Sequence, residues 1–156
     1  MPLDVEARLA KLGLTLPDAP SPAANYVPFV IARGLAFISG QAPVRDGKYA
    51  FTGRVGNEIT VDDAQAAARL CGLNILAQVK AAVGGDWSRL KGCVRICGYV
   101  SSAPSFFDQP KVLDGCSDLM VQALGEAGRH ARSALGVAAL RGNVPVAVDA
   151  IFELAD

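Results

Sequence analysis

Residues 90–102, LKGCVRICGYVSS, constrain the fold of this chain more than any other segment. Their side chains alternate as in a β-strand, and both faces of that strand are largely apolar. One face carries Val94, Ile96 and Val100, and the other carries Cys93, Arg95, Cys97 and Tyr99. A strand of this kind belongs in the middle of a sheet that is covered on both sides.

Two long helical patterns flank this strand in the sequence. Residues 61–85 follow a capping-box-like Thr60, and residues 110–127 open with Pro110, which suits the first turn of a helix. Two helices can cover only one face of a sheet. The other face of the 90–102 strand must therefore meet something else, and a second subunit is the simplest candidate.

The remaining apolar runs are shorter and surround turn residues. Residues 27–39 predict a β-hairpin about Arg33-Gly34. Residues 131–154 predict two strands around 141–143, a loop that is compatible with a second hairpin. With the two helices, this order predicts an α+β fold in which a mostly antiparallel sheet has both long helices on one face.

The N-terminal residues 1–23 have a different sequence pattern from the rest of the chain. Residues 4–12 predict a short helix that ends at Gly13, and three prolines between positions 17 and 22 predict an extended connector. Nine helical residues cannot form a core, so we expect this helix to pack on the main fold. The predicted division is residues 1–23, the helix and Pro-rich lead-in, and residues 24–156, a single α+β domain.

The charge balance argues against two classes of protein. The chain has 15 basic and 15 acidic residues, so it lacks the excess positive charge that attracts nucleic acids. No unbroken apolar stretch reaches the ~20 residues of a membrane span. The first residues include Asp4 and Glu6, where a secretory or transit peptide would be positively charged. We therefore expect a cytoplasmic protein without a membrane segment or a nucleic-acid partner.

The four cysteines do not form a metal-binding pattern. Cys93 and Cys97 lie four residues apart in the predicted strand. This spacing separates them by about 13 Å, which is too far for a disulfide bond. Cys71 and Cys116 have no nearby histidine or second cysteine pair. We expect four free, buried thiols and no metal site.

The polar cluster RHARS, residues 129–133, leads into the strand that starts near residue 131. Arg132 would share a face with Ala134 and Gly136, and these small neighbours would leave room for a carboxylate at the guanidinium. The spacing alone nevertheless favours an arginine that reaches water from a strand edge. His130 is the only histidine and has no serine or cysteine partner nearby in the sequence, so we expect an exposed side chain.

Two stretches resemble the Rid family, also called YjgF-type or L-PSP reactive intermediate deaminases. They are ANYVPFVIARGLAFISGQAPV (24–44), with its SGQ-x-P ending, and ARSALGVAAL…VPVAVDAIFEL (131–154). The lead-in LxxLGLTLPxxPxPxANYVP and the segment GEAGRHARSALGVAAL resemble a longer subgroup often labelled putative endoribonuclease. The resemblance implies a chorismate-mutase-like α+β fold and a homotrimer with ligand clefts between subunits. It also implies hydrolysis of enamine or imine acids to 2-keto acid and ammonia without any cofactor.

The resemblance also assigns site residues. Arg132 matches the family's essential arginine, which holds the substrate carboxylate. Tyr26 matches the cleft tyrosine from the neighbouring subunit, and Gly40 matches a cleft glycine in SGQ. These matches imply a small carboxylate-bearing imine as the substrate, bound between subunits of a homotrimer.

Three positions depart from the family pattern. The glutamate that positions the attacking water falls on Ala147, the cleft cysteine falls on Ala134, and the cleft asparagine falls at or beside Asp114-Gly115. Asp149 lies two residues beyond Ala147 on the same strand face. It could replace the missing carboxylate only if the backbone shifts.

Three functions follow, in decreasing order of support. The first is hydrolysis of a small 2-imino acid, with the carboxylate held by Arg132. The second is a non-catalytic trimer that binds small carboxylates or a partner protein, which the retained arginine without the glutamate would suit. The third is endoribonuclease activity, which one histidine and zero net charge support least.

Overall fold

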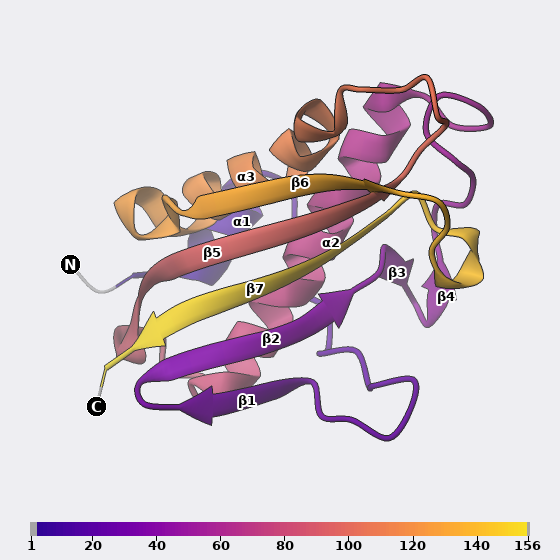
Figure 1. The fold of residues 1–156 in the computed structure, drawn as a ribbon. Coiled ribbons are helices and arrows are strands. Elements are labelled where there is room, and N and C mark those ends of the chain that lie inside the picture. Colours follow the sequence, from indigo (N-terminus) through magenta and orange to yellow (C-terminus); the bar gives the residue numbers. More distant parts are fainter. Residues whose placement is uncertain (1–2, 156) are drawn as a thin grey trace.

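The computed structural model describes residues 3–155 and has an α+β fold of two layers (Figure 1). One layer is a five-stranded sheet with the strand order β1-β2-β7-β5-β6. Its strands are β1 (Phe29–Ala32), β2 (Leu35–Gln41), β5 (Leu90–Ser101), β6 (Ala131–Val137) and β7 (Val146–Leu154). A separate two-stranded ribbon contains β3 (Val44–Arg45) and β4 (Lys48–Tyr49).

The second layer consists of α2 (Val61–Ala82) and α3 (Gln109–Leu124), which lie side by side on one face of the sheet (Figure 1). Thr60 caps α2, since its hydroxyl accepts a hydrogen bond of 3.2 Å from the Asp63 amide. The apolar stripes of both helices and the facing side of the sheet form one buried core. The predicted α+β fold, with two long helices on one face of a mostly antiparallel sheet, is confirmed.

The N-terminal helix α1 (Val5–Lys11) packs on α3 and shares this core. Its Val5 and Leu9 side chains are fully buried. The lead-in after α1 is fixed to α2, because the buried Gln78 amide donates a hydrogen bond of 2.7 Å to the Pro20 carbonyl. Within residues 3–155, no helix combines the length and the apolar character needed to cross a bilayer.

The predicted hairpin about residues 141–143 is wrong. The two strands around this loop, β6 and β7, do not pair: β5 lies between them, antiparallel to β7 and parallel to β6. The reason is burial. β7 buries every second residue, from Val146 to Leu154, and therefore needs a central position, whereas β6 is exposed or half-buried throughout and suits an edge. The loop instead contains a short 3₁₀ turn, Arg141–Asn143.

The sequence predicts that the side chains of β5 alternate between the two faces of the sheet, and this prediction is wrong at the start of the strand. The register with β7 shifts between Cys93 and Arg95, which is a β-bulge. Cys93 consequently faces the helices in the core, and Val94 is 42% exposed, the reverse of the prediction for both residues. Beyond the bulge, Ile96 and Val100 face the core as expected.

Candidate functional site

The predicted site residues fall into two groups in one chain. Arg132, Ala134, Asp114 and Gly115 lie on β6 and α3, on the side of the sheet that the helices cover. Tyr26, Gly40 and Ala147 line a pocket at the ends of β2 and β7. Residues 3–155 hold no cluster of three side chains that could bind a metal ion.

Arg132 is held by the N-terminal half of α3. It pairs in register with Ile96, a core residue, so its side chain points to the helix layer. Its Nη1 donates hydrogen bonds to Asp114 Oδ1 (2.8 Å) and Ser117 Oγ (3.1 Å), and its Nη2 donates to the Pro110 carbonyl (3.3 Å). Three of the five guanidinium N–H donors are used in these contacts. Two remain for a ligand, and 28% of the side chain is exposed.

Ala134 and Gly115, the two small residues predicted near Arg132, lie in different surroundings from each other. Ala134 shares its face and pairs with Gly98, beside the core. Gly115 lies on the side of α3 that faces α2, where a Cβ atom would overlap the Gln65 carbonyl. Gly115 therefore permits close packing of the two helices. Neither residue brings a polar group to the guanidinium.

A serine–histidine pair adjoins Arg132, and the sequence did not predict it. His130 Nε2 lies 2.9 Å from Ser117 Oγ, although the two residues are 13 positions apart. His130 Nδ1 lies 2.6 Å from the Gly128 carbonyl oxygen. One signal was available: Asp114 and Ser117 are three residues apart in a predicted helix, so they share the face that meets Arg132.

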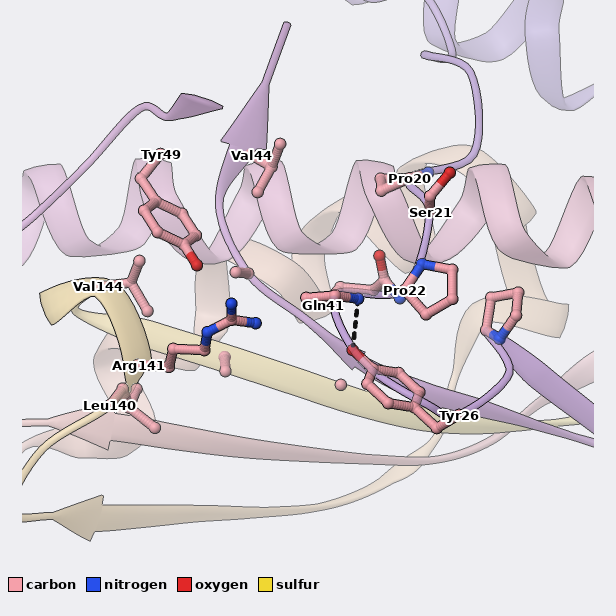
Figure 2. Close-up of a pocket in the computed structure, with 15 residues that line it drawn as sticks. Pro20, Ser21, Pro22, Tyr26, Gln41, Val44, Tyr49, Leu140, Arg141 and Val144 are labelled. Atoms are coloured by element: carbon pink, nitrogen blue, oxygen red, sulfur yellow. Dashed lines mark hydrogen bonds between the residues drawn. The ribbon is translucent and has the colours of Figure 1, made fainter. Parts of the chain in front are cut away.

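The second group lines a pocket of about 250 Å³ (Figure 2). Its walls come from the lead-in, the end of β2, Tyr49 and the turn before β7. Figure 2 shows the Tyr26 ring beside Gln41 and the lead-in. The Tyr26 hydroxyl accepts a hydrogen bond of 3.4 Å from the Ala23 amide. The pocket thus depends on the Pro-rich segment as well as on the sheet.

Arg141 is a pocket residue that sequence analysis assigned only to a turn. Its guanidinium extends towards the Tyr49 hydroxyl in Figure 2, and it makes no ion pair with a described residue. Gly142, with φ of 69°, lies directly against the Tyr49 ring, and a Cβ atom at this position would overlap the ring. The glycine therefore fixes both the turn and the tyrosine.

Asp149 lies on the open face of the sheet, as does Ala147. Its Oδ2 accepts a hydrogen bond of 2.9 Å from the Tyr99 hydroxyl. The neighbouring Cys97 thiol and the Asp149 carboxylate raise the pKa of Tyr99 well above its usual range, so the hydroxyl stays protonated and keeps donating. Asp149 is therefore engaged on the face opposite to the one that carries Arg132.

The four cysteines are buried and unpaired, as predicted. Burial raises the pKa of Cys93 to about 12 and also raises those of Cys71 and Cys116 well above the usual value of a thiol. A buried thiol of this kind is a poor nucleophile. These three thiols are therefore poor candidates for a catalytic nucleophile.

Comparison with known proteins agrees with the fold. A family model described as "YjgF/chorismate mutase-like, putative endoribonuclease" matches residues 6–151. The protein TCP17 of Trypanosoma cruzi is 45% identical over 151 residues, which cover 96% of this chain and 94% of that protein.

Three solved structures extend the comparison. A protein of unknown function from Agrobacterium tumefaciens is 50% identical, with a TM-score of 0.92 over 97% of this chain and 92% of its own. A putative endoribonuclease from Shewanella oneidensis is 38% identical, with a TM-score of 0.92 over 96% and 99%. The TdcF protein of Escherichia coli shares the fold at 22% identity, with a TM-score of 0.63 over 88% and 94%. The chain belongs to the YjgF-type Rid family, and its fold is the YjgF/chorismate-mutase-like fold of that family.

Proposed function

We propose that this protein hydrolyses small 2-imino or enamine acids to 2-keto acid and ammonia, in clefts between the subunits of a homotrimer. The observation that carries the proposal is the free donor capacity of Arg132. Two of its N–H groups have no partner among residues 3–155, and three contacts hold the guanidinium in place. Such a group binds a carboxylate through paired hydrogen bonds.

The separation of the predicted site residues within one chain supports assembly into an oligomer. Arg132 and the pocket of Tyr26, Gly40 and Ala147 lie in different parts of one chain, so a cleft at a subunit contact would join them. The open face of the sheet exposes apolar side chains, namely Val30 (52%), Phe37 (41%) and Leu135 (47%). Exposed apolar area on this scale is typical of an interface.

The reaction requires addition of water across a carbon–nitrogen double bond. Arg132 would hold the carboxylate and draw electron density from the adjacent imine carbon, which water then attacks. One water proton moves to the imine nitrogen to give a carbinolamine. Its hydroxyl proton then moves to the same nitrogen, the carbon–nitrogen bond breaks as the carbonyl forms, and ammonia leaves. The 2-keto acid remains. We place this chemistry in the cytoplasm, in keeping with the four free thiols.

The test is release of ammonia and keto acid from imino acids that an amino acid oxidase generates in the assay. We expect activity in the wild type and loss of activity in Arg132→Ala. Arg89→Ala is the matched control, because Arg89 is an exposed arginine in the 3₁₀ turn that precedes β5. A wild type without activity on any imino acid, with the trimer intact, would contradict the proposal.

A specific observation favours a second candidate, a trimer that binds small carboxylates without converting them. No acidic side chain lines the pocket, and Asp114 already pairs with Arg132. In this case calorimetry would detect binding of 2-keto acids that Arg132→Ala abolishes, without any turnover of imino acids.

Ribonuclease activity, which the names of several relatives suggest, has the least support. The net charge is zero, and the chain has one histidine. We expect no RNA cleavage by the purified protein and no affinity with a steep salt dependence. Cleavage that Arg132→Ala abolishes in an intact trimer would favour ribonuclease activity over the deaminase.

A further inference from the structure

The hydrogen bonds of His130 determine which ring nitrogen carries its proton. A carbonyl oxygen only accepts hydrogen bonds, so the contact of 2.6 Å to Gly128 requires a hydrogen on Nδ1. In the neutral ring, Nε2 then holds a lone pair that faces Ser117 Oγ at 2.9 Å. Gly128 is buried and lies against the Met120 carbonyl so closely that no Cβ would fit, which holds the accepting carbonyl in place.

The serine hydroxyl connects this base to the arginine. Ser117 Oγ accepts from Arg132 Nη1 at 3.1 Å, so its own hydrogen is available to His130 Nε2. Arg132 also favours a negative charge that develops on this oxygen. The arrangement of base, hydroxyl and cation is that of an activated hydroxyl group.

The position of a substrate follows from the chemistry of a 2-imino acid. The imine carbon is bonded directly to the carboxylate carbon. A carboxylate on the free donors of Arg132 would therefore anchor the imine carbon at the same guanidinium group that contacts the Ser117 hydroxyl. The charged groups facing the pair are Arg132 from β6 and Asp114 from α3, and Glu126 on the adjoining turn is paired with Arg129.

We propose that Ser117 and His130 transfer the protons of imine hydrolysis, in place of the carboxylate that this chain lacks at Ala147. The inference rests on the proposed function. The attacking water gives a proton to Ser117 Oγ while the serine proton passes to Nε2, and the water oxygen bonds to the imine carbon. A proton then returns through Ser117 to the imine nitrogen, which gives a neutral carbinolamine. The carbinolamine hydroxyl passes its own proton to the nitrogen by the same route, the carbon–nitrogen bond breaks as the carbonyl forms, and ammonia leaves. No electron acceptor or cofactor is required.

The first test compares turnover and pH dependence in three variants. His130→Gln and Ser117→Ala should lower kcat about 10²-fold or more with little change in KM, because positioned acid–base groups contribute about 10²–10⁴-fold. The pH dependence of kcat should differ between the wild type and His130→Gln, because the variant lacks the proposed base. Ser117→Thr, which keeps the hydroxyl, should retain the wild-type pH dependence. Ser105→Ala, an exposed serine outside the site, is the control.

The outcomes separate this inference from the proposed function. An active wild type and a His130→Gln variant with the same kcat and pH profile would overturn the proton transfer and leave the deaminase standing. A wild type inactive on all imino acids would remove the deaminase itself.

A second measurement uses no turnover. The single histidine gives one set of imidazole nitrogen signals in NMR spectra, which should report hydrogen on Nδ1. Saturating pyruvate should shift the Nε2 signal in the wild type and not in Arg132→Ala. Hydrogen on Nε2 in the neutral ring would refute the arrangement.

Discussion

Ala147, the position to which the resemblance assigns the family's glutamate, presents a methyl group to the pocket. If Ser117 and His130 carry the protons, a carboxylate restored at this position should matter most when the histidine is missing. We expect Ala147→Glu to raise kcat modestly in the wild type and by a larger factor in the His130→Gln background. Steady-state kinetics on a 2-aminoacrylate-type substrate measures both factors.

Two controls accompany this comparison. Ala139→Glu adds the same charge to the exposed loop after β6 and should leave kcat unchanged. Ala147→Glu combined with Arg132→Ala should stay inactive, because an activated water is ineffective beside an unanchored substrate. Equal stimulation in both backgrounds would show that the carboxylate and the histidine act independently.

The residues of the site differ in how far sequence could predict them. Arg132 is assigned to the site by the family resemblance, because the spacing of its small neighbours alone favours an arginine that reaches water from a strand edge. The sequence predicts an exposed His130, because its partner Ser117 reaches it only through the packing of α3 beside β6. It predicts Arg141 only as a turn residue, because periodicity does not determine where a loop side chain points.

Gly115, one of the predicted site residues, has a structural role in the packing of the two long helices. Gly115 allows the backbone of α3 to approach Gln65 on α2. We expect Gly115→Ala to lower the free energy of unfolding by about 1–3 kcal/mol, the usual cost of overpacking. Gly40→Ala is the matched change, since a Cβ there meets nothing within 4 Å, and should leave stability unchanged. Urea unfolding at equal protein concentration measures both, and equal midpoints would contradict the packing role.

The attachment of α1 predicts a pH effect on stability. Burial of Glu6 opposes its charge, but Lys80, at 2.8 Å, and the Trp87 indole N–H, at 2.6 Å, outweigh burial and lower the pKa of Glu6. A lowered pKa stabilises the folded state above the unfolded-state value of 4.5, and that stability is lost as pH falls through the folded-state value. Because the pair is partly exposed, Glu6→Gln should cost less than about 1 kcal/mol at pH 7.

Unfolding curves at pH 7 and pH 3 test this expectation. The difference between the wild type and Glu6→Gln should shrink at the lower pH, because the carboxylate loses its charge as it gains a proton. Asp18→Asn in the lead-in is a control without an ion pair among the described residues. A constant difference at both pH values would mean that shape, rather than charge, fixes α1.

Element types were predictable from the chain, whereas their partners were not. The two long helices and the 27–39 hairpin follow from local periodicity and turn chemistry. The position of β7 between β2 and β5 depends on which strand has the greater need for burial, which is a comparison across the whole chain. The bulge at Cys93 lies in a run whose residue types fit either face.

At the scale of the whole molecule, we expect a subunit contact on the open face of the sheet to complete the site. Leu135 lies on this face beside Tyr99, half exposed, on the edge strand that also carries Arg132. We expect light scattering after gel filtration, at micromolar concentration, to give the mass of three chains of 16.2 kDa. Leu135→Asp should lower that mass, because a carboxylate buried at an apolar interface without a partner is costly.

The same variant links assembly to activity. If the cleft combines Arg132 of one subunit with the pocket of another, Leu135→Asp should lose imine hydrolysis together with the trimer, although it touches neither group. Val121→Asp is the matched control, since Val121 is an exposed residue of α3 in the helix layer and should affect neither property. Raising the concentration of Leu135→Asp should restore mass and activity in parallel, because association follows mass action. A monomer that remains fully active would place the whole reaction within one chain and refute the shared cleft.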